Sequence, residues 1–125
     1  MNSSEHFSEK ELACRCGCGE GVMDERLLEL LEAIRVEYGK PMVISSAYRC
    51  PTWNAAVSST GRVGPHTTGK AVDVLCRGKD AHQLLAIALE EGVPGIGVFQ
   101  RGVHRKRFLH FDVIEGVGRP YIWSY

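Results

Sequence analysis

The chain has 125 residues, a length typical of one domain with a single hydrophobic core. Its 15 basic and 15 acidic side chains give a formal net charge of zero, which argues against nucleic acid as a partner because nucleic-acid-binding domains usually carry a basic excess. The sequence has no apolar run as long as a membrane span, and its polar start lacks the apolar core of a signal peptide. We therefore expect a monomeric single domain over residues 1–125, cytoplasmic when made, with no nucleic acid and no membrane as a partner.

Residues 1–23 are rich in glycine and cysteine and predict an irregular entry segment. Three of the chain's five cysteines crowd into CRCGCG, at Cys14, Cys16 and Cys18. Cysteines at alternate positions cannot easily all bond one another, but they can share a metal ion or pair with Cys50. Reduced thiols, a disulfide and a structural zinc site are three interpretations that the sequence leaves open.

Two amphipathic helices and four short strands are predicted after this segment. Residues 23–40 have apolar side chains at helical spacing, with Asp24 as the N-cap, and residues 81–92 form the second helix with Asp80 as its N-cap. Runs of β-branched or alternating apolar residues predict strands over residues 41–48, 69–76, 95–100 and 107–114. This pattern indicates an α+β domain, with two helices packed on a small antiparallel sheet of about four strands.

Two segments fall outside these helices and strands. Residues 49–65 contain Pro, Asn, Ser and Gly throughout and predict a long loop with one helical turn at residues 51–57, and loops of this length in a compact domain are usually functional. Residues 118–125 form a short aromatic tail. We expect its Trp123 to fill the core rather than to line a cleft with Trp53 and Tyr48.

The sequence HTTGKAVD, residues 66–73, sets His66 in a loop and Asp73 within the following predicted strand. A third residue of this type, His110, lies in the last predicted strand. Two histidines and one carboxylate, with a position left open for water, form a ligand set typical of catalytic zinc. The spacing alone is also typical of a structural histidine–aspartate pair, so it does not decide between the two interpretations.

HTTGKAVD, together with LHFD at residues 109–112, resembles the His-x-x-Gly-x-Ala-x-Asp and His-x-Asp patterns of the zinc D-Ala-D-Ala carboxypeptidases and L-Ala-D-Glu endopeptidases. That family shares its core with the hedgehog signalling domain. The sequence ISSAYRCPTWN, residues 44–54, is similar to the family's Ser-Gly/Ala-Tyr-Arg segment. FSEKELACRCGCG and GIGVF look like its phage and prophage branch. The resemblance extends over nearly the whole chain, with the motifs in the right order.

The resemblance implies a hedgehog/D-Ala-D-Ala peptidase-like fold with Zn²⁺ bound by His66, Asp73 and His110. It implies that Arg49 grips a carboxylate or carbonyl of the substrate, a role that suits a planar and always charged guanidinium group. It also implies hydrolysis of peptidoglycan stem peptides, as in a phage or prophage cell-wall lytic enzyme (an endolysin) that reaches the wall by export or release.

The chain departs from the family pattern at two positions. Gly64 stands where relatives often have a serine, and Arg107 stands where several relatives have an acidic general base, a role that arginine cannot fill. Two other residues are candidates for the base. Asp112 should share the face of His110 in the strand, and His104 has an ordinary pKa near neutrality. Asp112 is equally suited to orienting His110. The alternative for His104 is an exposed position in a loop without a catalytic role.

Three alternatives therefore remain open. The first is a non-catalytic zinc-containing module that binds cell-wall peptide or builds a phage particle. The second is a zinc-stabilised interaction domain like the hedgehog relatives. The third is a protein that binds metal through CRCGCG, in which the histidines are incidental.

Overall fold

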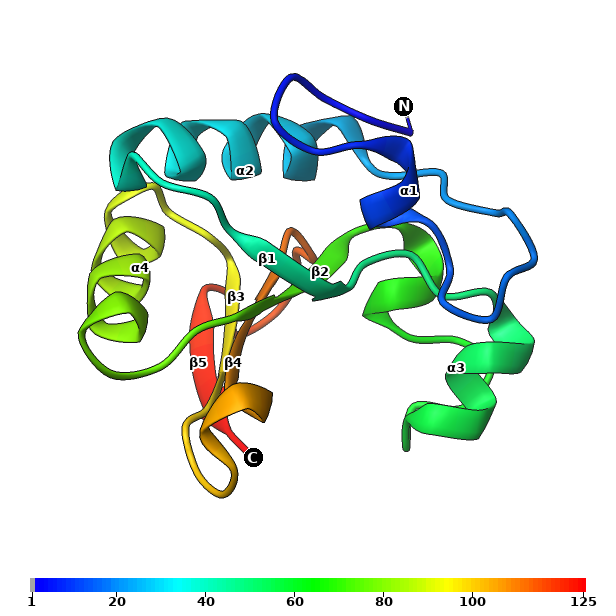
Figure 1. The fold of residues 1–125 in the computed structure, drawn as a ribbon. Coiled ribbons are helices and arrows are strands. Elements are labelled where there is room, and N and C mark those ends of the chain that lie inside the picture. The colour runs from blue at the N-terminus through cyan, green and yellow to red at the C-terminus, as the bar shows by residue number, and fades with distance from the viewer. Residues whose placement is uncertain (1) are drawn as a thin grey trace.

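A five-stranded sheet runs through the middle of the molecule (Figure 1). The computed structural model describes residues 2–125. In order across the sheet, the strands are β1 (Val43–Ser46), β2 (Ala71–Leu75), β4 (Phe108–Asp112), β3 (Gly95–Phe99) and β5 (Tyr121–Ser124). Neighbouring strands pair antiparallel except β3 and β5, which pair in parallel. The predicted α+β class is confirmed, and the segment expected to be an aromatic tail adds a parallel edge strand, β5, to the four predicted strands.

The described part of the chain also contains four α-helices and two 3-10 helices, of which the first two α-helices precede β1 and the others connect the strands. They are α1 (Glu9–Leu12), α2 (Glu25–Tyr38), α3 (Pro51–Val57), η1 (Pro65–Thr68), α4 (Gly78–Glu90) and η2 (His104–Lys106). As predicted, α2 begins after Asp24, whose carboxylate accepts a hydrogen bond from the Leu27 N–H, and it ends at Gly39 in the left-handed region. The entry segment is not wholly irregular, since α1 forms within it behind a capping box of Ser8 and Glu11.

The predicted N-cap of the second long helix was wrong. α4 begins at Gly78, and its N-cap residue, Arg77, makes no side-chain cap. Asp80 therefore lies in the first turn, where a carboxylate interacts favourably with the helix dipole. Its Oδ1 also accepts a hydrogen bond from Lys40 Nζ at 2.7 Å.

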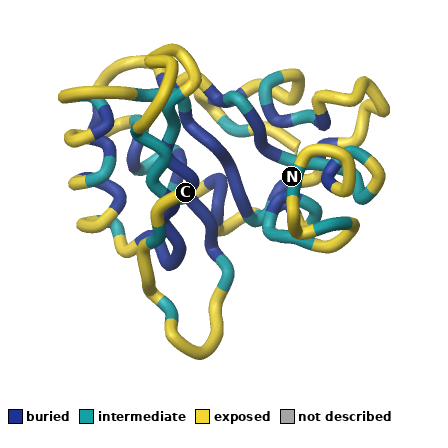
Figure 2. The backbone as a smooth tube through the Cα atoms, turned by 90° about the horizontal axis from the view of Figure 1, so that it is seen from below, coloured by how far each residue is buried: buried dark blue, intermediate teal, exposed yellow. Residues whose placement is uncertain are grey.

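The hydrophobic core lies between one face of the sheet and the long helices α2 and α4. Val72, Val74, Leu109 and Phe111 alternate along β2 and β4 and are all buried in this core. Figure 2 shows these central strands as the buried interior of the molecule. The intervening residues of the same strands point to the opposite face of the sheet, which is the face that carries the chemistry. None of the helices within residues 2–125 is long and apolar enough to cross a membrane.

Candidate metal centre

One row of residues crosses the sheet from β1 to β5. Ser46 pairs with Asp73, Asp73 with His110, His110 with Gly97, and Gly97 with Trp123. Residues that lie opposite one another on neighbouring strands present their side chains on the same face. The sheet register therefore brings Asp73, His110 and Trp123 together, although the first and the last are 50 positions apart in the sequence.

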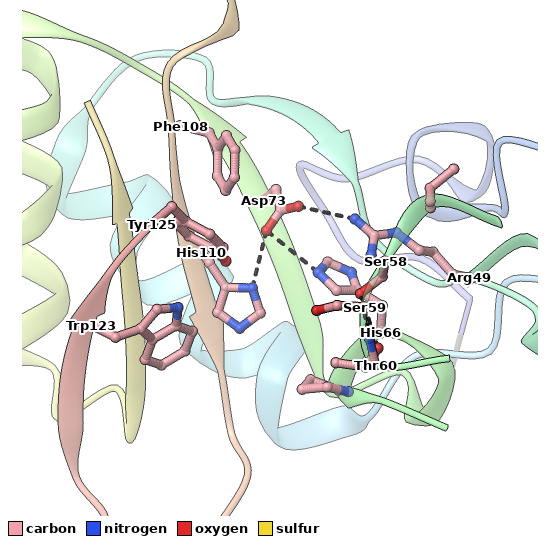
Figure 3. Close-up of a pocket in the computed structure, with 12 residues that line it drawn as sticks. Arg49, Ser58, Ser59, Thr60, His66, Asp73, Phe108, His110, Trp123 and Tyr125 are labelled. Carbon is pink, nitrogen blue, oxygen red and sulfur yellow. Dashed lines mark hydrogen bonds and ion pairs between the residues drawn. The ribbon is translucent and has the colours of Figure 1, made fainter. Parts of the chain in front are cut away.

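The three predicted metal ligands converge on one point (Figure 3). Asp73 Oδ1 lies 3.1 Å from His110 Nδ1 and 3.4 Å from His66 Nε2, and all three side chains are buried. His66 comes from η1, which Gly69 ends in the left-handed region with φ of 72°. A Cβ atom at Gly69 would collide with the carbonyl of Val22, so only glycine fits this tight entry into β2.

These separations fit a zinc ion. Zinc bonds of about 2.0–2.2 Å in tetrahedral geometry set ligand atoms about 3.4 Å apart. The second ring nitrogen of each histidine is also held, with His66 Nδ1 2.7 Å from the Ala47 carbonyl oxygen and His110 Nε2 2.8 Å from Asp112 Oδ2. Such partners fix the ring orientation and the tautomer that presents the other nitrogen to a metal.

The charges around Asp73 keep it ionised. Burial raises the pKa of Asp73, but the hydrogen bonds and charges of His110 and His66 outweigh burial and hold that pKa well below its usual value. Burial lowers the pKa of His110, but its hydrogen bonds to Asp112 and Asp73 raise the pKa overall. Asp73 is therefore ionised, and Arg49 Nη2 also lies 3.3 Å from its Oδ2.

Arg49 lies beside the ligands and is held in a fixed orientation. Its Nε donates to Ser46 Oγ at 2.9 Å, its Nη1 to Asn54 Oδ1 at 3.2 Å and its Nη2 to Asp73 Oδ2 at 3.3 Å. A guanidinium group has five N–H donors, so two remain for a ligand. Arg49 also lines the pocket in front of the metal centre.

That pocket has a volume of about 540 Å³ and two unlike walls. One wall comes from the segment after α3 and carries the hydroxyl groups of Ser58, Ser59 and Thr60. The other is aromatic and is made by Phe108, Trp123 and Tyr125 (Figure 3). The pocket can therefore hold an extended polar chain such as a peptide, with an apolar surface on one side.

The expectation that Trp123 fills the core was wrong. Its ring packs 5.0 Å from the His110 ring, centroid to centroid, and lines the pocket. β3 makes room for it, because a Cβ atom at Gly97 would lie 2.8 Å from the indole ring. Trp53 and Tyr48 are not among the described residues that line this pocket.

Asp112 shares the face of His110, as predicted from the alternation, but it lies behind that ring rather than in the pocket. It is completely buried, and its Oδ1 accepts hydrogen bonds from Arg119 Nη1 at 2.7 Å and from the Ile114 N–H at 3.1 Å. Burial raises the pKa of Asp112, but its partners His110 and Arg119 lower the pKa overall. Sequence reasoning missed Arg119. Gly95 leaves room for this side chain, because a Cβ atom at position 95 would collide with the Arg119 guanidinium group.

The structure does not bring His104 to the metal centre. His104 is exposed in η2, in the turn between β3 and β4 at the bottom of Figure 1, beside Arg77 and Asp80. Arg107 ends the same turn, and its side chain donates to the Gly102 carbonyl oxygen. Neither residue lines the pocket at the metal centre.

Gly64, the other departure from the family pattern, is matched by a hydroxyl group from elsewhere. A Cβ atom at Gly64 would collide with Thr60 Oγ1. Asn54 holds this threonine, donating from Nδ2 to Thr60 Oγ1 at 2.8 Å and to the Gly61 carbonyl oxygen at 2.6 Å. The Thr60 hydroxyl thus occupies the space that a serine side chain at position 64 would take.

The family comparison covers all three predicted ligands. The peptidase M15 family model matches residues 5–112, most of the chain. The chain belongs to the peptidase M15 family. Its members are zinc-dependent metallopeptidases. The resemblance noted in the sequence and the predicted hydrolase class are therefore confirmed at the level of the family. A comparison with curated proteins finds no match for the chain.

Proposed function

We propose that this M15 peptidase is a zinc-dependent hydrolase of peptidoglycan stem peptides, acting at a D-Ala-D-Ala or an L-Ala-D-Glu bond. The observation that carries the proposal is the convergence of His66, Asp73 and His110 beside Arg49, at the base of an open pocket. The enzyme would act as a monomer on the cell wall after export or release, as in a phage or prophage setting.

The metal would supply the reactive centre. Zinc at this site would lower the pKa of a bound water to about 7 and would polarise a peptide carbonyl. His66 and His110 would each offer one ring nitrogen to it, and Asp73 would offer the carboxylate charge that partly neutralises it. The hydrogen bonds of both histidines to Ala47 and Asp112 keep these nitrogens pointed at the ion.

The remaining pocket residues would position the substrate. The two unused N–H groups of Arg49 suit a stem-peptide carboxylate, which a guanidinium group binds as a planar fork. The Ser58, Ser59 and Thr60 hydroxyl groups can hydrogen-bond to peptide groups along the opposite wall. Aromatic side chains on the other side would exclude water from the reacting bond.

Asp112 is better placed to orient His110 than to move a proton. Both of its carboxylate oxygens are engaged, one by His110 and the other by Arg119, and it does not reach the pocket. Within the described residues, the only histidines and carboxylates that line the pocket are the three ligands themselves. This observation favours a second candidate function, a non-catalytic zinc-containing module that binds cell-wall peptide.

The test is mass spectrometry of peptidoglycan after incubation with the protein, with and without a chelator. We expect stem-peptide products that disappear with the chelator, return with added zinc and are absent with His110→Ala, and their masses will identify the bond. One zinc ion that the wild-type protein binds and His110→Ala loses, with saturable peptide binding but no product from several wall types, would establish the binding module instead. Unchanged zinc content in His110→Ala would contradict both functions.

A further inference from the structure

Four cysteines gather at a place that the peptidase site does not use. Cys14, Cys16 and Cys18 lie in the loop after α1, and Cys50 lies at the N-cap of α3. Figure 1 shows this loop reaching down to the start of α3. The four sulfur atoms lie within 4.8 Å of one another, and none of these residues lines the pocket.

The sulfur separations match a shared metal better than a disulfide. Cys14 Sγ lies 3.4 Å from Cys16 Sγ, which lies 3.7 Å from Cys50 Sγ. A disulfide needs an S–S distance of about 2.05 Å. Four thiolates around zinc, with bonds of about 2.3 Å, set their sulfur atoms about 3.8 Å apart.

The loop backbone explains how alternate cysteines face one point. In an extended strand, the side chains at alternate positions would all point to one side, in a straight row. Such a row could not surround an ion. Gly17 and Gly19 instead adopt left-handed conformations, with φ of 86° and 83°, and fold the segment into a turn. The Cys14 N–H closes the turn by donating to the Glu20 carbonyl oxygen at 2.8 Å.

Backbone N–H groups also point at the sulfur atoms. The Cys50 N–H donates to Cys14 Sγ at 3.3 Å, and the Trp53 N–H donates to Cys50 Sγ at 3.4 Å. Hydrogen bonds of this kind are stronger when the acceptor is charged, so they favour thiolates at both positions. Thiolate is the form in which cysteine binds a metal.

We propose that Cys14, Cys16, Cys18 and Cys50 bind a second, structural zinc ion. The four cysteines complete a tetrahedral ligand set and leave no position for water, which is the hallmark of a structural site rather than a catalytic one. The inference goes beyond the proposed peptidase function and uses none of its ligands.

The structural ion would brace one side of the peptidase pocket. Cys50 directly follows Arg49, whose backbone N–H donates to the His66 carbonyl oxygen at 3.1 Å. Cys50 also begins α3, which carries the Asn54 that holds Thr60. A metal at the cysteines would therefore tie the entry loop to the elements that position the guanidinium group and the hydroxyl wall.

Metal content and cobalt spectra of the intact protein, purified under reducing conditions, test this proposal. We expect two zinc ions per chain in the wild type, one in His110→Ala and one in the double variant Cys16→Ser/Cys18→Ser. The control Cys76→Ser, which changes the one cysteine outside the cluster, should keep both. Cobalt-substituted His110→Ala should show the intense sulfur-to-metal charge-transfer absorption of a thiolate site in the near ultraviolet.

The cobalt spectrum keeps the test valid if the double cysteine variant fails to fold, because His110→Ala retains all four cysteines. One zinc ion in the wild type with none in His110→Ala, or a cobalt spectrum without the thiolate band, would overturn the proposal. An intact mass that reveals a Cys–Cys bond within the cluster would also overturn it. Failure of the peptidase assay alone would leave these readouts unchanged, so the two proposals fail separately.

Discussion

Asp112 reaches the metal centre only through the ring of His110, so it is a positioning residue. We expect Asp112→Asn to weaken zinc binding about 10–100-fold, because an amide holds the His110 Nε2–H less strongly than a carboxylate does. Competition with a chromophoric chelator measures this affinity. Asp80→Asn, which changes an exposed carboxylate bound to Lys40, is the matched control.

A different result would reassign the role of Asp112. If Asp112→Asn keeps full zinc affinity but loses about a hundredfold or more in kcat, the carboxylate acts in proton transfer. Zinc affinity therefore distinguishes the positioning role from the proton-transfer role, because removing a proton acceptor outside the ligand set would not change it.

Arg49 carries the second prediction at this scale. Arg49→Lys keeps the positive charge but removes the planar fork that binds a carboxylate through two hydrogen bonds, so we expect KM to rise on the order of tenfold with zinc content unchanged. Steady-state kinetics on a stem peptide measure the effect. Arg62→Lys changes an exposed arginine of the neighbouring loop and should leave KM as it is. An unaltered KM in Arg49→Lys would show that the substrate carboxylate binds elsewhere.

The convergence of His66, Asp73 and His110 was predictable because their types and motif are visible in the sequence, and strand alternation correctly placed Asp112 on the face of His110. Arg119 and Thr60 were not predictable. Each acts through a contact with a residue on another segment, Asp112 and Asn54 respectively. Such contacts depend on the register and the packing of the finished fold, which local patterns do not contain.

Among the strands, β3 is the one whose glycines shape the site. We expect Gly97→Ala to displace β5 and to destabilise the protein by about 1–3 kcal/mol, because the new methyl group would lie 2.8 Å from the Trp123 ring. Denaturant unfolding measures the loss, and tryptophan fluorescence reports the displaced ring. In the double variant Gly97→Ala/Trp123→Ala the two costs should be clearly less than additive. Full additivity would mean that the methyl group strains a different contact.

The entry segment is fastened to α2 through Glu32. This carboxylate accepts hydrogen bonds from Ser4 Oγ at 2.6 Å and from the His6 N–H at 2.8 Å. Burial raises the pKa of Glu32, but these hydrogen bonds and the His6 ring, whose Nδ1 lies 2.5 Å from Glu32 Oε1, outweigh burial and lower the pKa below the ordinary value of 4.5. A carboxyl group whose pKa is lowered by folding stabilises the protein above its ordinary pKa and ceases to do so as the pH falls through the lowered pKa.

We therefore expect Glu32→Gln to lower the Tm by about 3–6 °C at pH 7 and to match the wild type once the pH lies below the lowered pKa. Thermal unfolding followed from neutral to acidic pH measures this difference. Glu29→Gln, at an exposed position of the same helix, should not change the Tm. A difference that stays constant down to the acidic limit would show that Glu32 acts through its shape rather than its charge.

Helix and strand prediction succeeded where the pattern was strong and failed at α1, at β5 and at the start of α4. α2 and the antiparallel strands follow from apolar periodicity. β5 was missed because residues 121–124 are mostly exposed. In addition, β5 pairs with β3 in parallel, so no hairpin turn in the sequence indicates the pairing. The start of α4 was placed three residues late because Asp80 resembles an N-cap, whereas the helix already begins at Gly78.

At the scale of the whole molecule, the division of the sheet into two faces was contained in the sequence. Alternation assigned one set of strand residues to the core and left Asp73, His110 and Asp112 on the other face. Two of the three residues of the aromatic wall, Trp123 and Tyr125, lie beyond the family match, which ends at residue 112, whereas Phe108 lies within it.

The two sets of proposed metal ligands are distributed very differently along the chain. His66, Asp73 and His110 meet only after β2 and β4 have paired, so the unfolded chain has no comparable site. Cys14, Cys16 and Cys18 lie within one short loop, so three of the four proposed ligands of the structural zinc ion are already close together in the unfolded chain. We expect the cysteines to take up metal while the chain is still emerging from the ribosome and the histidine site to fill last. Hydrolytic capacity would then begin only when the sheet is complete, and a half-made chain would carry metal without being able to cut.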